Sequence, residues 1–222
     1  MHNPRLGLIR VLTTDNLDLL QSHERIIKKA FPQITIESRC IPDQFDGVHD
    51  DESEALAISK VASLGRQFAQ EGFDAVYVSC VGDPGVALLQ KELSIPVIGA
   101  GRATGHVISA CQMPVGALSI TDDAPGVTPA ILGDLLLKTV RPEKIHTTLD
   151  LFRPEAEDEL VSAGLALKEL GAKGIMLACT GLSTIGIAPK LQERLGLTIF
   201  DPLRCAMGVI WSVLCAGEKT NN

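Results

Sequence analysis

The chain has 222 residues and a net charge of −7 at pH 7, so nucleic acid and anionic membranes are not expected partners, because both bind clustered Lys and Arg side chains. Hydrophobic residues make up 45% of the chain and aromatic residues only 4%, which predicts an aliphatic core. The apolar stretch between Arg5 and Arg10 is too short for a signal sequence, and no run of 18 apolar residues occurs. We therefore expect a cytoplasmic protein.

Strand and helix patterns alternate along the chain. Short apolar runs predict strands near residues 6–12, 34–39, 74–79, 95–99, 115–120, 145–149, 174–178 and 197–200. Between them, apolar residues at helical spacing predict helices, as in NLDLLQSHERIIKKAF and PEAEDELVSAGLALKEL. This alternation predicts an α/β fold whose parallel sheets are covered by helices on both faces.

The order of these patterns repeats. LGLIRVLT opens the first set and MPVGALSIT the second, and each set closes on a short strand, in SIPVIG and in GLTIFDP. We predict two similar lobes, each a four-stranded parallel sheet flanked by helices, related by pseudo-two-fold symmetry. The first lobe is expected over residues 1–101 and the second over 102–202, with the C-terminal helix 203–222 packing back on the first.

Two of the six cysteines end equivalent apolar runs, Cys80 in DAVYVSCVGDPG and Cys179 in AKGIMLACTGLSTIG. Open α/β sheets bind ligands at the carboxyl ends of their strands, so the matched positions predict a facing pair of thiols. Because the chain carries no export signal, the cysteines are expected to be reduced. The remaining four are expected as small buried packing residues: Cys40, Cys111, Cys205 and Cys215.

Each of these two cysteines precedes a predicted helix, whose N-terminus would help to lower the thiol pKa. Asp83 followed by Pro84 predicts a capped helix over residues 84–92. After the second cysteine, Ser183 or Thr184 is expected to cap the next helix. Both loops also have a glycine two positions after the cysteine, which allows backbone N–H groups to turn toward a bound anion.

The two thiols indicate proton transfer. A nucleophilic cysteine requires a base such as histidine beside it, and neither loop contains one. Two facing thiols instead suit an acid/base pair, in which one removes a proton from a carbon next to a carbonyl and the other returns a proton to the opposite face. The cysteines form no CxxC pair and the five histidines are scattered, so no metal site is expected.

CVGDPG with SIPVIGAG, and LACTGLSTIG with GLTIFDP, resemble the aspartate/glutamate/hydantoin racemase superfamily, most closely its hydantoin racemase branch. The resemblance covers nearly the whole chain. It implies an active site between two α/β lobes, no cofactor, a homo-oligomer of two or more copies, and Cys80 and Cys179 as the acid/base pair. It also implies that the substrate's carbonyl or carboxylate is held around Val81, Gly82, Thr180 and Gly181.

The turn after the first strand departs from the pattern of the superfamily. Hydantoin racemases typically have an asparagine there and glutamate racemases an aspartate-serine pair, whereas this chain reads LIRVLTTDN. Arg10 either clamps a carboxylate, which would make the substrate an anionic small molecule, or forms a structural ion pair. Thr13 and Thr14 either bind substrate or cap the first helix, and the same alternatives hold for Thr121 and Asp122 in the second lobe.

Two further patterns are expected to have no catalytic role. The glycines of the segment 99–105, GAGRATG, have the wrong spacing and position for a dinucleotide-binding loop. The acidic stretch HDDESE at residues 49–54 is expected to be a solvated first turn of a helix. Two alternative functions remain open, a cis-trans isomerase of the maleate type on the same scaffold and a non-catalytic protein that binds a small molecule.

Overall fold

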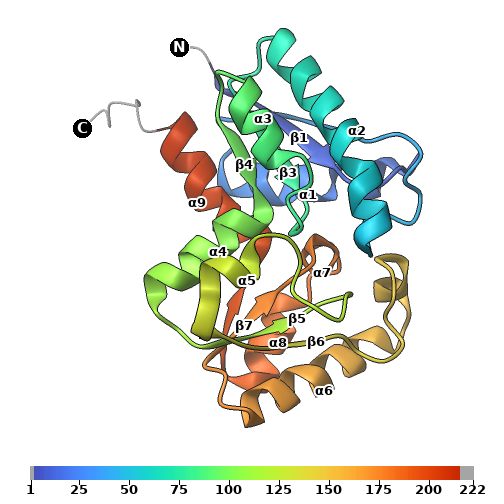
Figure 1. Ribbon diagram of the computed structural model, residues 1–222, viewed down its shortest axis with the longest axis vertical. Helices are drawn as coiled ribbons and strands as arrows, with labels where there is room; N and C mark the ends of the chain where they lie inside the picture. Colours follow the sequence, from blue (N-terminus) through green and yellow to red (C-terminus); the bar gives the residue numbers. More distant parts are fainter. Residues whose placement is uncertain (1–2, 216–222) are drawn as a thin grey trace.

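The computed structural model describes residues 3–215 and consists of two α/β lobes, stacked one above the other in Figure 1. The sheet of the first lobe has the strand order β2-β1-β3-β4, and all of its strands are parallel. Its elements are β1 (Arg5–Arg10), α1 (Leu17–Ala30), β2 (Thr35–Cys40), α2 (Asp51–Gln70), β3 (Ala75–Ser79), α3 (Val86–Glu92) and β4 (Val97–Gly99).

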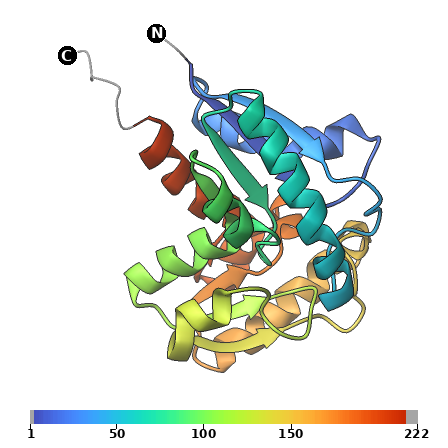
Figure 2. The ribbon, with the colours of Figure 1, turned by 45° about the horizontal axis from the view of Figure 1, so that its top comes forward.

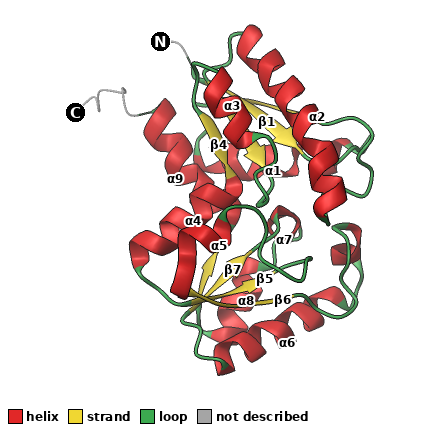
Figure 3. Cartoon of the chain, viewed as in Figure 1, coloured by secondary structure: helices red, strands yellow, loops and turns green. Residues whose placement is uncertain are grey.

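The second lobe repeats this topology. Its parallel sheet has the order β6-β5-β7-β8. Counted along the chain, the first to fourth strands of this lobe therefore take the same places in their sheet as β1 to β4 take in theirs. Its elements are α4 (Ala100–Cys111), β5 (Val115–Leu118), α5 (Thr128–Leu132), β6 (Leu136–Val140), α6 (Ala156–Glu169), β7 (Gly174–Leu177), α7 (Thr180–Thr184), α8 (Ala188–Leu195), β8 (Thr198–Phe200) and α9 (Pro202–Leu214), with short 3-10 helices at Gly133–Leu135 and Leu149–Phe152. Figure 3 shows both sheets in yellow between their helices. The predicted fold class is confirmed.

One predicted strand is wrong. The sixth strand is β6, Leu136–Val140, whereas residues 145–149 form a loop that enters a 3-10 helix. The carboxylate of Asp150 explains the loop, because it accepts hydrogen bonds from the backbone N–H groups of His146 and Thr147, both at 2.9 Å. This local side-chain bonding satisfies the backbone in place of a sheet. Ile145 is fully buried in this loop, which explains why its sequence resembles a strand.

Helices cover both faces of each sheet. In the first lobe, α2 and α3 cover one face with Val61, Phe68 and Leu89, and in the second lobe α6 and α8 do so with Leu160 and Leu191. The other face of the first sheet is covered by α1, α4 and α9, and that of the second by α4, α5 and α9. Helices α4 and α9, on the left of Figure 2, thus pack on both lobes. Among residues 3–215, none of these helices is long and apolar enough to span a membrane.

The last helix, α9, packs on both lobes. Leu203, Ala206 and Ile210 join the core of the first lobe, as the sequence predicts, while Cys205 joins the core of the second. Residues 216–222 of the predicted C-terminal helix lie outside the described residues. The prediction of four packing cysteines holds for Cys205 and Cys215, but Cys40 is only half-buried and Cys111, in the last turn of α4, is exposed.

Candidate active site

A cavity of about 720 Å³ lies between the lobes and is lined by both of them. Cys80 directly follows β3 and Cys179 follows β7, so each thiol stands at the carboxyl end of an equivalent parallel strand and both line this cavity. The loop after β5 brings the lobes together, since a Cβ added at Gly126 would lie 2.4 Å from the carbonyl oxygen of Gly82. Both cysteines therefore line one cavity between the lobes.

The Cys80 thiol lies among acidic side chains. The Glu54 carboxylate packs against the loop that follows the cysteine, where a Cβ on Gly82 would lie 2.9 Å from Glu54 Oε2. Burial is the main cause that raises the pKa of the Cys80 thiol, and the charges of Cys179, Asp83 and Glu54 raise it further. A hydrogen bond from the Gly82 backbone N–H acts in the opposite direction.

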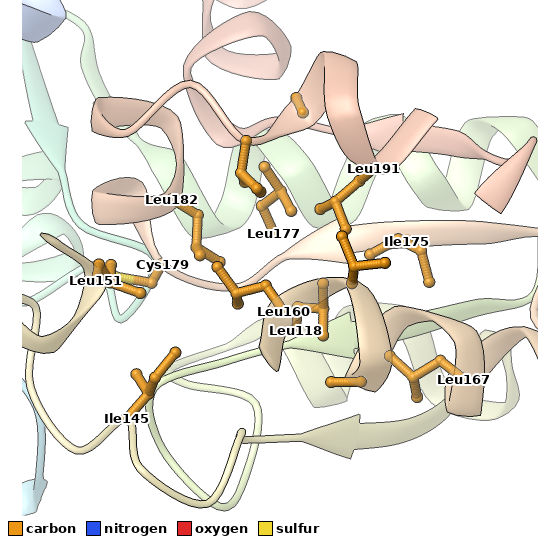
Figure 4. Close-up of a cluster of buried hydrophobic side chains, with 14 of the residues drawn as sticks. Leu118, Ile145, Leu151, Leu160, Leu167, Ile175, Leu177, Cys179, Leu182 and Leu191 are labelled. Carbon is orange, nitrogen blue, oxygen red and sulfur yellow. The ribbon is translucent and has the colours of Figure 1, made fainter. Parts of the chain in front are cut away.

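The Cys179 thiol itself caps α7. Its Sγ accepts a hydrogen bond from the Gly181 N–H at 3.3 Å. The prediction that Ser183 or Thr184 caps this helix is wrong: the Ser183 hydroxyl donates instead to Asp201 at 2.9 Å. The sulfur occupies the cap because Cys179 directly precedes Thr180, the first residue of α7. Figure 4 shows Cys179 beside Leu151, at the edge of the second lobe's apolar cluster.

Burial raises the pKa of the Cys179 thiol to about 11, although the backbone N–H groups of Gly181 and Leu182 and the Arg10 guanidinium lower it. The expectation of lowered thiol pKa values is therefore wrong for both cysteines. Desolvation outweighs the helix N-termini because each of the two cysteine residues is only 8% exposed. At neutral pH each thiol is mainly protonated, and Cys179 ionises more readily because its charged neighbour is a cation.

This asymmetry predicts that Cys179 reacts with iodoacetamide about tenfold or more faster than Cys80 at pH 8, since one pKa unit changes the thiolate fraction tenfold. The two cysteine residues have the same exposed fraction, so their overall burial is matched. The reaction of Cys179 should accelerate as the pH rises toward 11. Peptide mass spectrometry measures both rates, with exposed Cys111 as internal reference. Faster labelling of Cys80 would contradict the assignment, whereas Glu54→Gln should accelerate Cys80 alone.

Asp83 does not cap the helix that follows it. Helix α3 begins at Val86 after Gly85, and the buried Asp83 carboxylate instead accepts hydrogen bonds from the N–H groups of Gly101 and Arg102, at 2.8 and 2.7 Å. It therefore caps α4, a helix from a later part of the chain. Burial raises the pKa of Asp83 to about 6, and these two N–H groups oppose the rise.

The glycines of residues 99–105 allow this contact. A Cβ added at Gly99 would lie 2.5 Å from the Asp83 carboxylate, and one at Gly101 would lie 2.0 Å from the backbone carbonyl oxygen of Val81. Both distances are far below normal contact, so only glycine lets α4 approach the Cys80 loop this closely. The segment that resembles a nucleotide-binding loop thus serves the packing of α4 against the Cys80 loop.

Arg10 ends β1 and lines the cavity, and only 3% of it is exposed. Its Nη1 donates to the carbonyl oxygens of Leu19 and Leu20 at 2.6 and 3.1 Å and to Ser22 Oγ at 3.0 Å. Within the described part of the chain it has no carboxylate partner, so the alternative of a structural ion pair is not supported. Burial lowers the pKa of Arg10 to about 10, and the group remains a cation at neutral pH.

The other predicted binding residues divide into two groups. Val81, Gly82, Thr121, Thr180 and Gly181 all line the cavity. Thr13 is not among the lining residues, because its hydroxyl donates to the Ile41 carbonyl at 2.6 Å and accepts from the Gln44 N–H at 2.8 Å. Neither Thr13 nor Thr14 caps α1, since Asn16 does so.

The carboxylates that line the cavity have different surroundings. Asp122 is exposed and accepts a hydrogen bond from Arg141 at 2.8 Å. The stretch 49–54 contains a capping box between Asp50 and Ser53, and the exposed Asp51 and Glu52 agree with the expected solvated turn. Glu54 is the exception, because it is half-buried at the Cys80 loop. Its position four residues after the helix cap Asp50, one turn into α2, could have indicated an inward-facing side chain.

His23 on α1 is a second residue that sequence reasoning missed. Its ring is fully buried and connects the two lobes. Nδ1 lies 2.7 Å from Ser79 Oγ, next to the first cysteine, and Nε2 lies 2.7 Å from Thr184 Oγ1, in the helix after the second. No local motif marks it, because its partners are 56 and 161 residues away.

The two-lobed fold with a site between the lobes is typical of racemases. The profile of the Asp/Glu/Hydantoin racemase family matches residues 13–210, and the chain belongs to this family. It is 26% identical over 186 residues to a hydantoin racemase of Paenarthrobacter aurescens, covering 76% of this chain and 73% of that protein. It is 25% identical over 197 residues to a hydantoin racemase of Pseudomonas sp. (strain NS671), covering 85% and 76%.

Solved structures show the same fold. Allantoin racemase from Pseudomonas fluorescens aligns with a TM-score of 0.80 at 21% identity, covering 98% of this chain and 93% of that one. Glutamate racemase from Francisella tularensis subsp. tularensis SCHU S4, in complex with D-glutamate, aligns with a TM-score of 0.65 at 15% identity, covering 99% and 85%. The predicted superfamily is confirmed.

Proposed function

We propose that the protein is a cofactor-independent racemase or epimerase acting at a carbon next to a carbonyl, with Cys80 and Cys179 as acid and base. One observation carries the proposal: the two thiols occupy equivalent strand ends of two repeated lobes and line one cavity. Each thiol also accepts a hydrogen bond from the backbone N–H of the glycine two residues further along the chain, Gly82 or Gly181. A near-symmetric pair of acid and base suits a reaction whose product mirrors its substrate.

In each turnover, the thiolate on one face takes the proton from the substrate's stereocentre, and the electron pair moves toward the adjacent carbonyl oxygen. The opposite thiol then gives its proton to the other face of the carbon. The enzyme ends with the protonation states of Cys80 and Cys179 exchanged, and the reverse reaction uses the same groups in the opposite roles. The easier ionisation of Cys179 makes it the first base in the resting enzyme.

Arg10 is the proposed anchor for a substrate carboxylate. Its guanidinium is buried at the cavity wall and its hydrogen-bond partners are neutral. A buried cation gains from an anionic partner far more than an exposed one, because the surroundings screen the charge less. A substrate that pairs with Arg10 in this cavity therefore carries one anionic group as well as its acidic C–H bond.

Arg10→Lys keeps the charge but loses the planar fork, and we expect it to raise the KM of carboxylate-bearing substrates about tenfold with a smaller change in kcat. Arg10→Ala should raise this KM further. Because Arg10 also bonds Leu19 and Leu20 of α1, the Tm of each variant is measured alongside. A KM unchanged for every carboxylate-bearing substrate would show that Arg10 only holds α1.

A substrate panel tests the proposed function. Enantiopure 5-substituted hydantoins, allantoin, aspartate and glutamate are followed by chiral chromatography, and maleate is followed for conversion to its trans isomer. Loss of optical purity in at least one chiral substrate supports the proposal. Conversion of maleate alone would assign the alternative isomerase activity, and binding of a panel member without any turnover would assign a binding protein.

A further inference from the structure

His23 lies outside the cavity lining but between the two loops that carry the cysteines. Its Nδ1 is 2.7 Å from Oγ of Ser79, the residue directly before Cys80. Its Nε2 is 2.7 Å from Oγ1 of Thr184, in the helix capped by Cys179. One imidazole ring therefore connects the first catalytic loop to the second.

The directions of these hydrogen bonds follow from the neighbours. The Thr184 hydroxyl donates its proton to the Thr180 carbonyl oxygen at 3.3 Å, so it accepts the bond from Nε2–H of His23. Nδ1 is then the acceptor, and Ser79 Oγ–H donates to it. This arrangement requires the neutral ring. Burial and the charge of Arg10 both lower the pKa of His23 well below its ordinary value, so the neutral ring is the stable form.

The bridge belongs to a closed circuit. Thr180, which directly follows Cys179, donates its hydroxyl proton to the Ser79 carbonyl oxygen at 3.0 Å. Ser79, His23, Thr184 and Thr180 thus form a ring of hydrogen bonds that crosses between the lobes. Every member except His23 lies either at the end of β3, directly before Cys80, or in α7, directly after Cys179. The two cysteine-bearing segments are therefore joined by two links, the direct bond from Thr180 to Ser79 and the longer bridge through the imidazole of His23.

We infer that His23 is a positioning residue that holds Cys80 and Cys179 at the separation that transfer of a proton to each face requires. The inference rests on the proposed function. A shift of about 1 Å in a reacting group can lower a rate about 100-fold, and removal of the ring lets Ser79 and Thr184 move relative to each other. The carbanion formed by one cysteine would then be reprotonated from the same face more often than from the opposite face.

The test compares His23→Leu with His23→Gln, using the panel member that the wild type racemises best. In deuterated water, the rate of deuterium uptake into the recovered starting enantiomer is compared with the rate of racemisation. We expect His23→Leu to lower racemisation about 30- to 100-fold and to raise the ratio of uptake to racemisation at least tenfold. His23→Gln offers a neutral donor and acceptor and should restore the ratio toward that of the wild type.

A purely structural role would lower both rates together and leave their ratio unchanged, and that result in both variants would overturn the inference. His106→Leu, at an exposed position of α4, is the matched control and should behave like the wild type. If His23→Leu does not fold, Ser79→Ala, which removes the bond to Nδ1, replaces it beside His23→Gln. A wild type that neither racemises nor exchanges any panel member would refute the proposed function instead.

Discussion

Replacing either Cys80 or Cys179 with serine should abolish racemisation, with kcat reduced about 1,000-fold or more. A serine hydroxyl is far less acidic than a thiol, and general acid–base catalysis by one group typically contributes a factor of about 100 to 10,000. Both thiols line the cavity and each is the only cysteine of its loop, so neither variant has a substitute proton donor beside it. Chiral chromatography of the panel substrates measures the loss.

The single variants should differ from inactive protein in one respect. The remaining cysteine can still remove a proton from the enantiomer whose C–H bond faces it and return a deuteron to the same face. Cys80→Ser and Cys179→Ser should therefore each exchange one enantiomer, and opposite enantiomers, without racemising either. Cys111→Ser, at an exposed position, is the control. A single variant that interconverts both enantiomers near the wild-type rate would contradict the two-base mechanism.

Gly101→Ala should be the most damaging small substitution outside the thiols. Its Cβ would lie 2.0 Å from the Val81 carbonyl oxygen, and because both groups belong to the backbone, neither can rotate away. Overpacking of this kind costs about 3 kcal/mol, which corresponds to a fall in Tm of roughly 6–12 °C for a chain of this size. Activity should fall as well, because the displaced contact includes the loop of Cys80.

The matched control is Gly208→Ala on α9. An added Cβ there meets nothing within 4 Å, and alanine favours a helix by about 1 kcal/mol over glycine. Its Tm should therefore rise by about 2–4 °C. Calorimetry of both variants compares the same chemical change at a crowded and an open helical position. Equal shifts in Tm would show that the close approach of α4 to the Cys80 loop is unimportant.

The sequence predicts the architecture because the strand signal is local. Buried parallel strands such as Ala75–Ser79 and Gly174–Leu177 are short apolar runs, and the internal repeat assigns them equivalent places. The prediction fails at residues 145–149, where the Asp150 carboxylate holds a turn around a buried Ile145. An isolated buried residue in a loop produces the same short apolar signal as an edge strand such as Leu136–Val140.

From the sequence, residues could be placed in the candidate site only where their location follows from the end of a predicted strand. Cys80, Cys179 and the glycines after them follow from the repeat. Asp83 does not, because its carboxylate caps α4 rather than the helix beside it. Likewise, the desolvation that raises the thiol pKa values depends on the packing of both lobes around the cavity, which no stretch of sequence records.

The origin of the proton in the product tests the two-cysteine mechanism most directly. One enantiomer of a panel substrate is incubated with wild-type protein in deuterated water, and the reaction is stopped at low conversion. The mechanism predicts a product that carries one deuteron at its stereocentre, while the recovered starting enantiomer retains its protium, because the donating thiol has exchanged with solvent and lies on the opposite face. A product that retains the original protium would contradict it.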